Sequence, residues 1–348
     1  MKIAVDAMGG DYAPKEIVFG TFDYARKFSG DTVFLVGKEE RIEQEIEKYC
    51  KKNGCVCPKN LIIVPAEEDI GMDEHPAAAV KKRKDCSLRV ANRLVKNRKA
   101  QAILSMGNTG GCVASSLFEL GRLPGVVRPS VATIFPTNKG GVVLLDMGAN
   151  IDCTPQQLLQ FAQLGSIYAE SVLNRKNPKV ALLNIGAEEI KGSKTLVQTY
   201  ELLKIQDDIN FVGNIEGDHI FFTKVDVIIC DGLVGNIILK TCEGLSHAML
   251  GMLKKCLDKN RIEESQQLKI FKDMESYSAR NPRYACAPLL GFGGLSIIGH
   301  GNSRAKKVFD SISVIREICN SRLEEKMKNF QNIAPKSGKL KVKSMETG

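Results

Sequence analysis

The chain has 348 residues, 43% hydrophobic and 26% charged, so it is long enough for a large buried core and is neither disordered nor collagen-like. Its formal net charge is +9, but from Lys326 onward there are six lysines against one acidic residue, Glu346, which leaves the rest only mildly basic. Aromatic residues make up 6% and Trp is absent, so the stacking platforms that bind nucleic acid lack material, and we predict no nucleic-acid partner.

Short apolar, β-branched runs recur along the chain and predict strands, with helical patterns between many of them. The strands are expected at residues 3–6, 32–36, 61–64, 102–105, 131–135, 142–146, 180–184, 211–213, 227–230 and 296–298. Helices are expected at residues 14–28, 39–52, 76–96, 155–173, 196–204 and 235–257. This alternation predicts a mostly parallel, Rossmann-like sheet in a three-layer α/β/α sandwich.

Two segments depart from the alternation. Helical stretches at residues 249–257 and 263–274 follow one another without a strand, which predicts a helical hairpin at about 249–282 that projects from the sheet layer. From residue 331 the sequence is rich in Pro, Ser, Gly and Lys and lacks periodicity, which predicts a basic disordered tail over 331–348. We therefore predict a single α/β domain over residues 1–330.

Most predicted strands end in a small or acidic polar residue followed by glycines. Such loops lie at residues 6–11, 105–111, 146–150, 184–186, 213–217, 231–236 and 299–302. The carboxyl ends of parallel strands meet at one sheet edge, where glycine exposes backbone N–H groups and helix N-termini favour anions. One such loop has a purely structural explanation, but seven together predict a site for phosphate or an oxyanion.

Other signatures are absent from the sequence. Neither G-x-x-x-x-G-K-[ST] nor G-x-G-x-x-G follows a strand, so a P-loop or a standard dinucleotide site is not expected. There is no G-x-S-x-G elbow, and no His pairs obviously with a Ser or Cys, so no covalent nucleophile is visible. We predict no metal site and no cofactor. His300 lies between glycines and could contact ligand or its own turn, while the 81–84 run of Lys and Arg could be a solvated helix face or direct a cation toward the loops.

Taken in order, the loops resemble the acyl-ACP:phosphate acyltransferase family of bacterial phospholipid synthesis (PlsX), and the resemblance runs from Met1 to about Arg304. It depends on the segments 5–11 VDAMGGD, 107–110 GNTG, 128–129 RP, 145–150 LDMGAN, 183–186 LNIG, 211–217 FVGNIEG, 230–236 CDGLVGN with 240–241 KT, and 287–291 APLLG with 299–301 GHG. Each segment is short, but eight in this order are specific to the family.

The resemblance implies an enzyme with a fold similar to phosphotransacetylases and isocitrate-type dehydrogenases. It would transfer a fatty acyl group from acyl carrier protein (ACP) to inorganic phosphate, giving acyl phosphate for glycerophospholipid synthesis. It also implies a homodimer. With no signal peptide or spanning segment in the sequence, we expect a cytoplasmic protein, and the basic tail suits peripheral association with the anionic inner face of the membrane.

Onto this chain the resemblance carries two sets of residues. The catalytic set is Asn108, Lys240, Asp231 and His300, with Asn108 holding phosphate and His300 protonating the departing thiolate. The substrate-binding set is Asp6, Gly9, Gly10, Asp11, Lys82, Arg83, Thr109, Gly110, Asn184, Asn214, Glu216 and Asn236. Two alternatives stay open: a phosphotransacetylase-like enzyme that uses acyl-CoA, and a protein that binds phosphoryl ligands without turnover.

Overall fold

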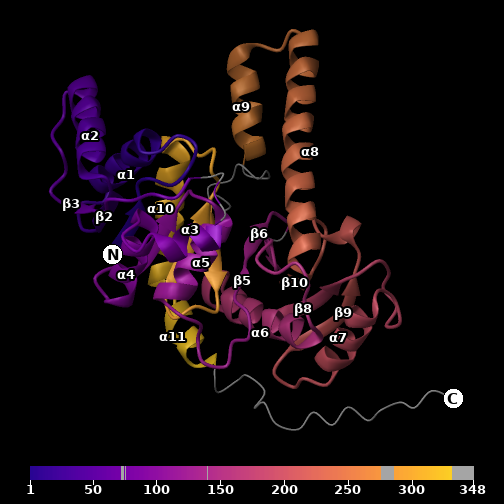
Figure 1. Cartoon of the computed structure of the whole chain (residues 1–348). Coiled ribbons are helices and arrows are strands. Elements are labelled where there is room, and N and C mark those ends of the chain that lie inside the picture. The colour runs from indigo at the N-terminus through magenta and orange to yellow at the C-terminus, as the bar shows by residue number, and fades with distance from the viewer. Residues whose placement is uncertain (72–73, 75, 139, 276–285, 331–348) are drawn as a thin grey trace.

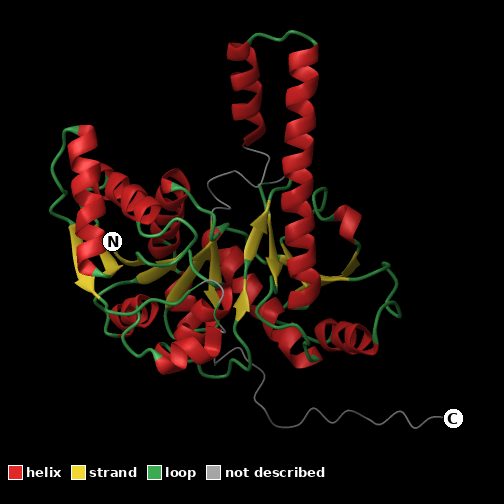
Figure 2. Cartoon of the chain, turned by 45° about the horizontal axis from the view of Figure 1, so that its top comes forward, coloured by secondary structure: helices red, strands yellow, loops and turns green. Residues whose placement is uncertain are grey.

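The computed structural model describes residues 1–71, 74, 76–138, 140–275 and 286–330. Within these residues the strands form two sheets, with helices on both faces (Figures 1 and 2). The predicted three-layer α/β/α fold class is confirmed, but the strands divide between two sheets instead of forming one. The predicted disordered tail, 331–348, and the end of the predicted hairpin, 276–282, lie outside the described residues.

The first sheet has seven strands in the order β3-β2-β1-β4-β12-β11-β5. β1 pairs in parallel with β2 and β4, β12 in parallel with β4, and β11 is antiparallel to both neighbours. The strands are β1 (Lys2–Asp6), β2 (Thr32–Gly37), β3 (Leu61–Pro65), β4 (Ala102–Ser105), β5 (Ser130–Val131), β11 (Cys286–Leu290) and β12 (Leu295–Gly299). β1 and β4 are almost wholly buried, because parallel strands in the middle of a sheet have both faces covered.

The second sheet has five strands in the order β6-β7-β10-β8-β9, all parallel except for the antiparallel pair β6 and β7. The strands are β6 (Thr133–Phe135), β7 (Val142–Leu145), β8 (Lys179–Leu183), β9 (Asn210–Ile215) and β10 (Val227–Ile229). Ala132 alone separates β5 from β6, so the chain passes here from one sheet to the other. The predicted single strand at 131–135 is therefore wrong: it is broken at Ala132.

Helices cover the sheets on both faces, and alternate residues of each strand face different layers. Ile3 and Val5 pack in one hydrophobic cluster with α1 and α10, whereas Ala4 packs in the other with α4 and α5. The helices outside the hairpin are α1 (Lys15–Lys27), α2 (Glu39–Asn53), α3 (Pro76–Lys82), α4 (Ser87–Lys96), α5 (Thr109–Glu119), α6 (Pro155–Val172), α7 (Lys194–Lys204), α10 (Ala305–Asn320) and α11 (Leu323–Lys328). The predicted helix at 76–96 is divided into α3 and α4.

The hairpin consists of α8 (Gly232–Lys259) and α9 (Glu264–Glu275) and projects from the body (Figures 1 and 2). The two predicted segments 235–257 and 249–257 belong to one continuous helix, α8. At 1.5 Å per residue its 28 residues span about 42 Å. Only Gly232 and Gly235 of α8 are fully buried, so the start of the helix anchors it to the body.

Candidate active site

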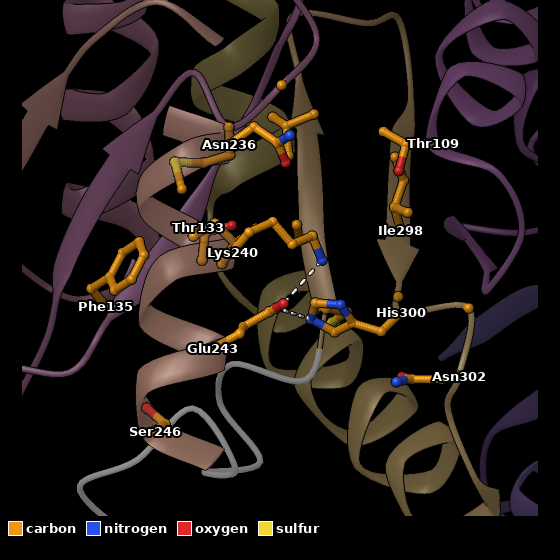
Figure 3. Close-up of a pocket in the computed structure, with 18 of the residues that line it drawn as sticks. Thr109, Thr133, Phe135, Asn236, Lys240, Glu243, Ser246, Ile298, His300 and Asn302 are labelled. Carbon is orange, nitrogen blue, oxygen red and sulfur yellow. Dashed lines mark hydrogen bonds and ion pairs between the residues drawn. The ribbon is translucent and has the colours of Figure 1, made fainter. Parts of the chain in front are cut away.

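A pocket of about 830 Å³ lies between the two sheets beside the base of α8 (Figure 3). Its wall includes Thr109 at the start of α5, Thr133 and Phe135 on β6, Asn236 and Lys240 on α8, and the loop that follows β12. This volume is within the range that binds drug-sized ligands. Five of the seven glycine loops, from two different sheets, contribute residues to this cavity, whereas the loops at 184–186 and 213–217 do not.

Lys240, Glu243 and His300 form a polar cluster in this pocket. Glu243 Oε2 accepts a hydrogen bond from Lys240 Nζ at 2.9 Å, and Glu243 Oε1 lies 3.5 Å from His300 Nε2 (Figure 3). Lys240 and Glu243 lie one turn apart on α8, and His300 follows β12, so the carboxylate joins the two walls of the pocket. Lys307 of α10 adds a second cation to the lining.

His300 is held in its neutral form. Burial, together with the positive charges of Lys307 and Lys240, lowers its pKa to about 4, although Glu243 acts in the opposite direction. Desolvation disfavours the imidazolium ion, and nearby cations repel it. At neutral pH His300 is therefore unprotonated, and it must gain a proton before it can protonate a thiolate.

Two helix N-termini contribute to the pocket region, and predicted catalytic residues cap both. Asn108 precedes α5 and its Oδ1 accepts from the backbone N–H of Gly111 at 3.2 Å. Asp231 precedes α8 and its Oδ1 accepts from the N–H of Val234 at 2.9 Å. These caps accept hydrogen bonds from backbone N–H groups that have no partner within the helix, while the helix dipoles favour an anion nearby. Asn108 and Asp231 themselves do not line the pocket, whereas Thr109 of α5 and Asn236 of α8 do.

Asp6 is a buried residue that connects two of the glycine loops. It accepts hydrogen bonds from Ser105 Oγ at 2.7 Å and from the N–H of Met8 at 3.1 Å. Burial raises its pKa, against hydrogen bonds that lower it. A Cβ at Gly9 would lie 2.6 Å from Asp6 Oδ2, so only glycine fits there. Asp6 and Gly9 thus tie the loop after β1 to the loop after β4.

The next residues of the same loop reach the pocket itself. Gly10 has a φ of +107°, which turns the chain so that the N–H of Asp11 bonds to the carbonyl oxygen of Gly301 at 2.9 Å. Asp11 lines the pocket and Gly110 lies one residue beyond Thr109, packed against Pro76. Of the predicted set, Asp11, Thr109, Asn236, Lys240 and His300 line the same cavity.

Eleven of the sixteen predicted residues do not line this cavity, and five of them lie outside the loops that contribute to it. Lys82 is exposed at the end of α3, and Arg83 donates to Glu74 Oε1 at 2.7 Å and to the carbonyl of Asp69 at 2.8 Å. The other three are at the β8 and β9 side of the second sheet: Asn184, Asn214 and Glu216. Both asparagines serve the 184–191 loop, because each amide donates to a backbone carbonyl there, at 2.9 and 2.8 Å.

Sequence reasoning missed three charged residues of the site. Glu243 and Lys307 lie in helical patterns where a charge is typical of a solvated face. Asp146 belonged to a quoted motif but was given no role. It is buried, and it accepts from the N–H of Val131 at 2.8 Å and from the N–H and amide of Asn150 at 2.7 and 2.9 Å. Asp146 therefore binds β5 of the first sheet to the loop after β7 of the second.

The fold is that of the phosphotransacetylases. A phosphotransacetylase from Streptococcus pyogenes superposes with a TM-score of 0.58 at 16% identity, covering 91% of this chain and 93% of that one. The EutD phosphotransacetylase from Staphylococcus aureus gives a TM-score of 0.57 at 14% identity, with the same coverage. At such low identity the likeness establishes the architecture alone.

Sequence comparison establishes the family. A family model described as a fatty acid synthesis protein matches residues 1–326. A phosphate acyltransferase from Desulforamulus reducens is 47% identical over 324 residues, covering 91% of this chain and 93% of that protein. One from Nostoc sp. is 41% identical over 337 residues, covering 96% and 97%. The chain belongs to the phosphate acyltransferase family, which confirms the resemblance found in its motifs.

Proposed function

We propose that this enzyme transfers a fatty acyl group from acyl-ACP to inorganic phosphate and so supplies acyl phosphate for glycerophospholipid synthesis. The observation that carries the proposal is the pocket between the two sheets, which joins polar and apolar walls. Lys240, Lys307 and Thr109 provide cations and a helix N-terminus for phosphate. Phe135 and Leu250, in the same lining, provide apolar surface for an acyl chain.

Phosphate attacks the thioester directly in this proposal. Cys286 is a thiol in the pocket lining, but burial raises its pKa to about 12, so it is not a thiolate at neutral pH. Phosphate already carries a nucleophilic oxygen, and the pocket has only to position it and stabilise the oxyanion that forms. Asn236, Lys240 and the start of α5 are the groups we assign to phosphate.

The test is phosphate-dependent release of the ACP thiol, with acyl phosphate trapped as the hydroxamate. Acyl-ACP and acyl-CoA should be compared at equal concentration. We expect turnover with acyl-ACP, because a mildly basic chain meets an acidic carrier protein favourably. Turnover with acyl-CoA alone would favour the phosphotransacetylase-like alternative, and no hydroxamate from either donor would favour a binding protein without turnover.

The hairpin supports a homodimer. Leu245, Met249 and Met252 of α8 and Leu268 of α9 are large apolar side chains that are more than half exposed. A second copy of the chain would cover such a surface. We expect light scattering to give twice the mass of one chain, and Met252→Lys to shift it toward the monomer. A monomeric wild-type protein would contradict this assignment.

Peripheral membrane association is the remaining part of the proposal. No helix in the described part of the chain is long and apolar enough to cross a membrane. The lysines from 336 to 343 would attract an anionic leaflet, at about 1 kcal/mol each. Cosedimentation with anionic vesicles should weaken on removal of residues 331–348, and unchanged binding after truncation would reject a role for the tail.

A further inference from the structure

The proposed reaction moves one proton from phosphate to sulfur. At neutral pH inorganic phosphate carries at least one P–OH group, the acyl phosphate dianion carries none, and the departing sulfur ends as a thiol. A thioester and hydrogen phosphate thus become an acyl phosphate dianion and a thiol without any other reactant. A group in the pocket that carries this proton must begin the reaction unprotonated.

His300 has the position and state of such a carrier. It follows β12 and lines the same pocket as Thr109 and Lys240, which we assign to phosphate. Its Nε2 faces Glu243 Oε1 at 3.5 Å, which favours the tautomer with hydrogen on Nε2 (Figure 3). The other ring nitrogen, Nδ1, is then a bare acceptor.

Glu243 has the position of a group that stabilises the imidazolium ion. Its two oxygens divide between two partners, Oε2 to Lys240 and Oε1 to His300. A carboxylate beside an imidazole fixes the ring and favours its charged form when a proton arrives. Both oxygens of Glu243 are directed at these two side chains, so we infer that it acts through His300 and Lys240.

We propose that His300 shuttles the proton from phosphate to the departing thiolate, and that Glu243 is the residue that positions it; this rests on the proposed acyl transfer. A phosphate oxygen bonds to the carbonyl carbon while the P–OH proton passes to His300 Nδ1. The tetrahedral oxyanion then collapses, the C–S bond breaks with its electron pair on sulfur, and Nδ1 returns the proton to that sulfur.

The other charged groups of the pocket are compatible with this cycle. Lys240 on α8 and Lys307 on α10 disfavour the imidazolium ion before phosphate arrives. The negative charge of bound phosphate offsets the positive charge of both lysines, and Glu243 and Asp11 add negative charge to the lining. His247 lines the pocket from α8 as well. Phosphate therefore creates the conditions under which His300 can hold a proton.

The test is a double-mutant cycle on the full chain with acyl-ACP and phosphate. His300→Gln should lower kcat by about 10²- to 10⁴-fold, the usual contribution of acid–base catalysis, with the phosphate KM changed less than about threefold. Glu243→Gln should lower kcat at least about tenfold alone, and by a smaller factor in the His300→Gln background, where only its contact with Lys240 remains to be lost.

Controls separate this inference from the proposed function. Glu47→Gln makes the same change in a remote exposed pair with Lys51 and should leave kcat unchanged. His300→Asn serves if His300→Gln fails to fold. A His300 variant with kcat within threefold of wild type, or a full additional loss from Glu243→Gln in the His300→Gln background, would overturn the shuttle. A wild-type protein without acyl phosphate formation would instead remove the proposed function.

Discussion

Gly235→Ala should displace the start of α8 relative to the body of the protein. Gly235 lies in the first turns of α8. A Cβ at this position would clash with the backbone carbonyl oxygen of Asp146. Real Cβ atoms essentially never come within 3.0 Å of such an atom, and this one would be more than 1 Å closer than that. That oxygen is backbone and cannot rotate away. The start of α8 must therefore shift by about 1 Å, and it carries Asn236, Lys240 and Glu243 with it.

The effect has two parts of different size. Overpacking costs about 1–3 kcal/mol, and the better helix propensity of Ala returns up to about 1 kcal/mol, so stability falls modestly. Catalysis suffers more, because a displacement of about 1 Å in positioning groups can cost about 10²-fold in rate. We expect a small fall in Tm and a loss of kcat of about two orders of magnitude.

Gly251→Ala provides the matched control on the same helix. A Cβ at Gly251 meets nothing within 4 Å, so this change should raise helix stability by up to about 1 kcal/mol and leave the kinetics alone. Both variants are compared by thermal unfolding and by phosphate-dependent thiol release. If Gly235→Ala is as active and as stable as Gly251→Ala, the positioning role of the α8 start is wrong.

Three further predictions concern titration and capping. The pKa of Asp6 is raised in the folded state, so the folded protein binds the Asp6 proton more tightly than the unfolded chain does. The unfolding free energy of wild type relative to Asp6→Asn should therefore fall as pH rises through that pKa. A difference in unfolding free energy that does not change with pH would contradict this. The pKa of His300 is about 4 in the folded protein, against an ordinary value of 6.5. Wild type should therefore lose stability relative to His300→Gln as pH falls from 6.5 to 4. Denaturant titrations that give a constant difference in unfolding free energy over this range would refute the prediction. Asn108→Ala should raise the phosphate KM and cost about 1 kcal/mol of cap energy, whereas Asn108→Ser should keep the cap; an equal Tm for the two would argue against capping.

The sequence predicted the layers and the loops because both depend on local patterns. Buried parallel strands appear as apolar runs, and loops at their ends need small residues. The break at Ala132 was not predictable in this way, because β5 and β6 form one continuous apolar run whose halves pair with different sheets. Likewise Pro288 inside β11 argues against a strand, yet its carbonyl accepts from the N–H of Ala132 at 3.0 Å.

The candidate site was predictable only in part, for a related reason. Thr109, Asn236 and His300 stand next to loop glycines, so a local motif marks them. Glu243 and Lys307 stand inside helices, and only the tertiary arrangement of α8 and α10 brings them to the pocket. The loops that carry Asn184 and Asn214 have the same local pattern as the others, but their strands lie at the far side of the second sheet.

The single residue between the two sheets limits how the pocket can open. Ala132 is buried and its N–H is bonded to Pro288, while the N–H of Val131 is bonded to the Asp146 carboxylate. This stretch of the pocket wall is thus bonded both to β11 of the first sheet and to Asp146 after β7 of the second. Separation of the two sheets at this point would break both of these hydrogen bonds. We expect a large acyl donor to enter by movement of the rim, where Glu243 of α8 contacts His300 in the loop after β12.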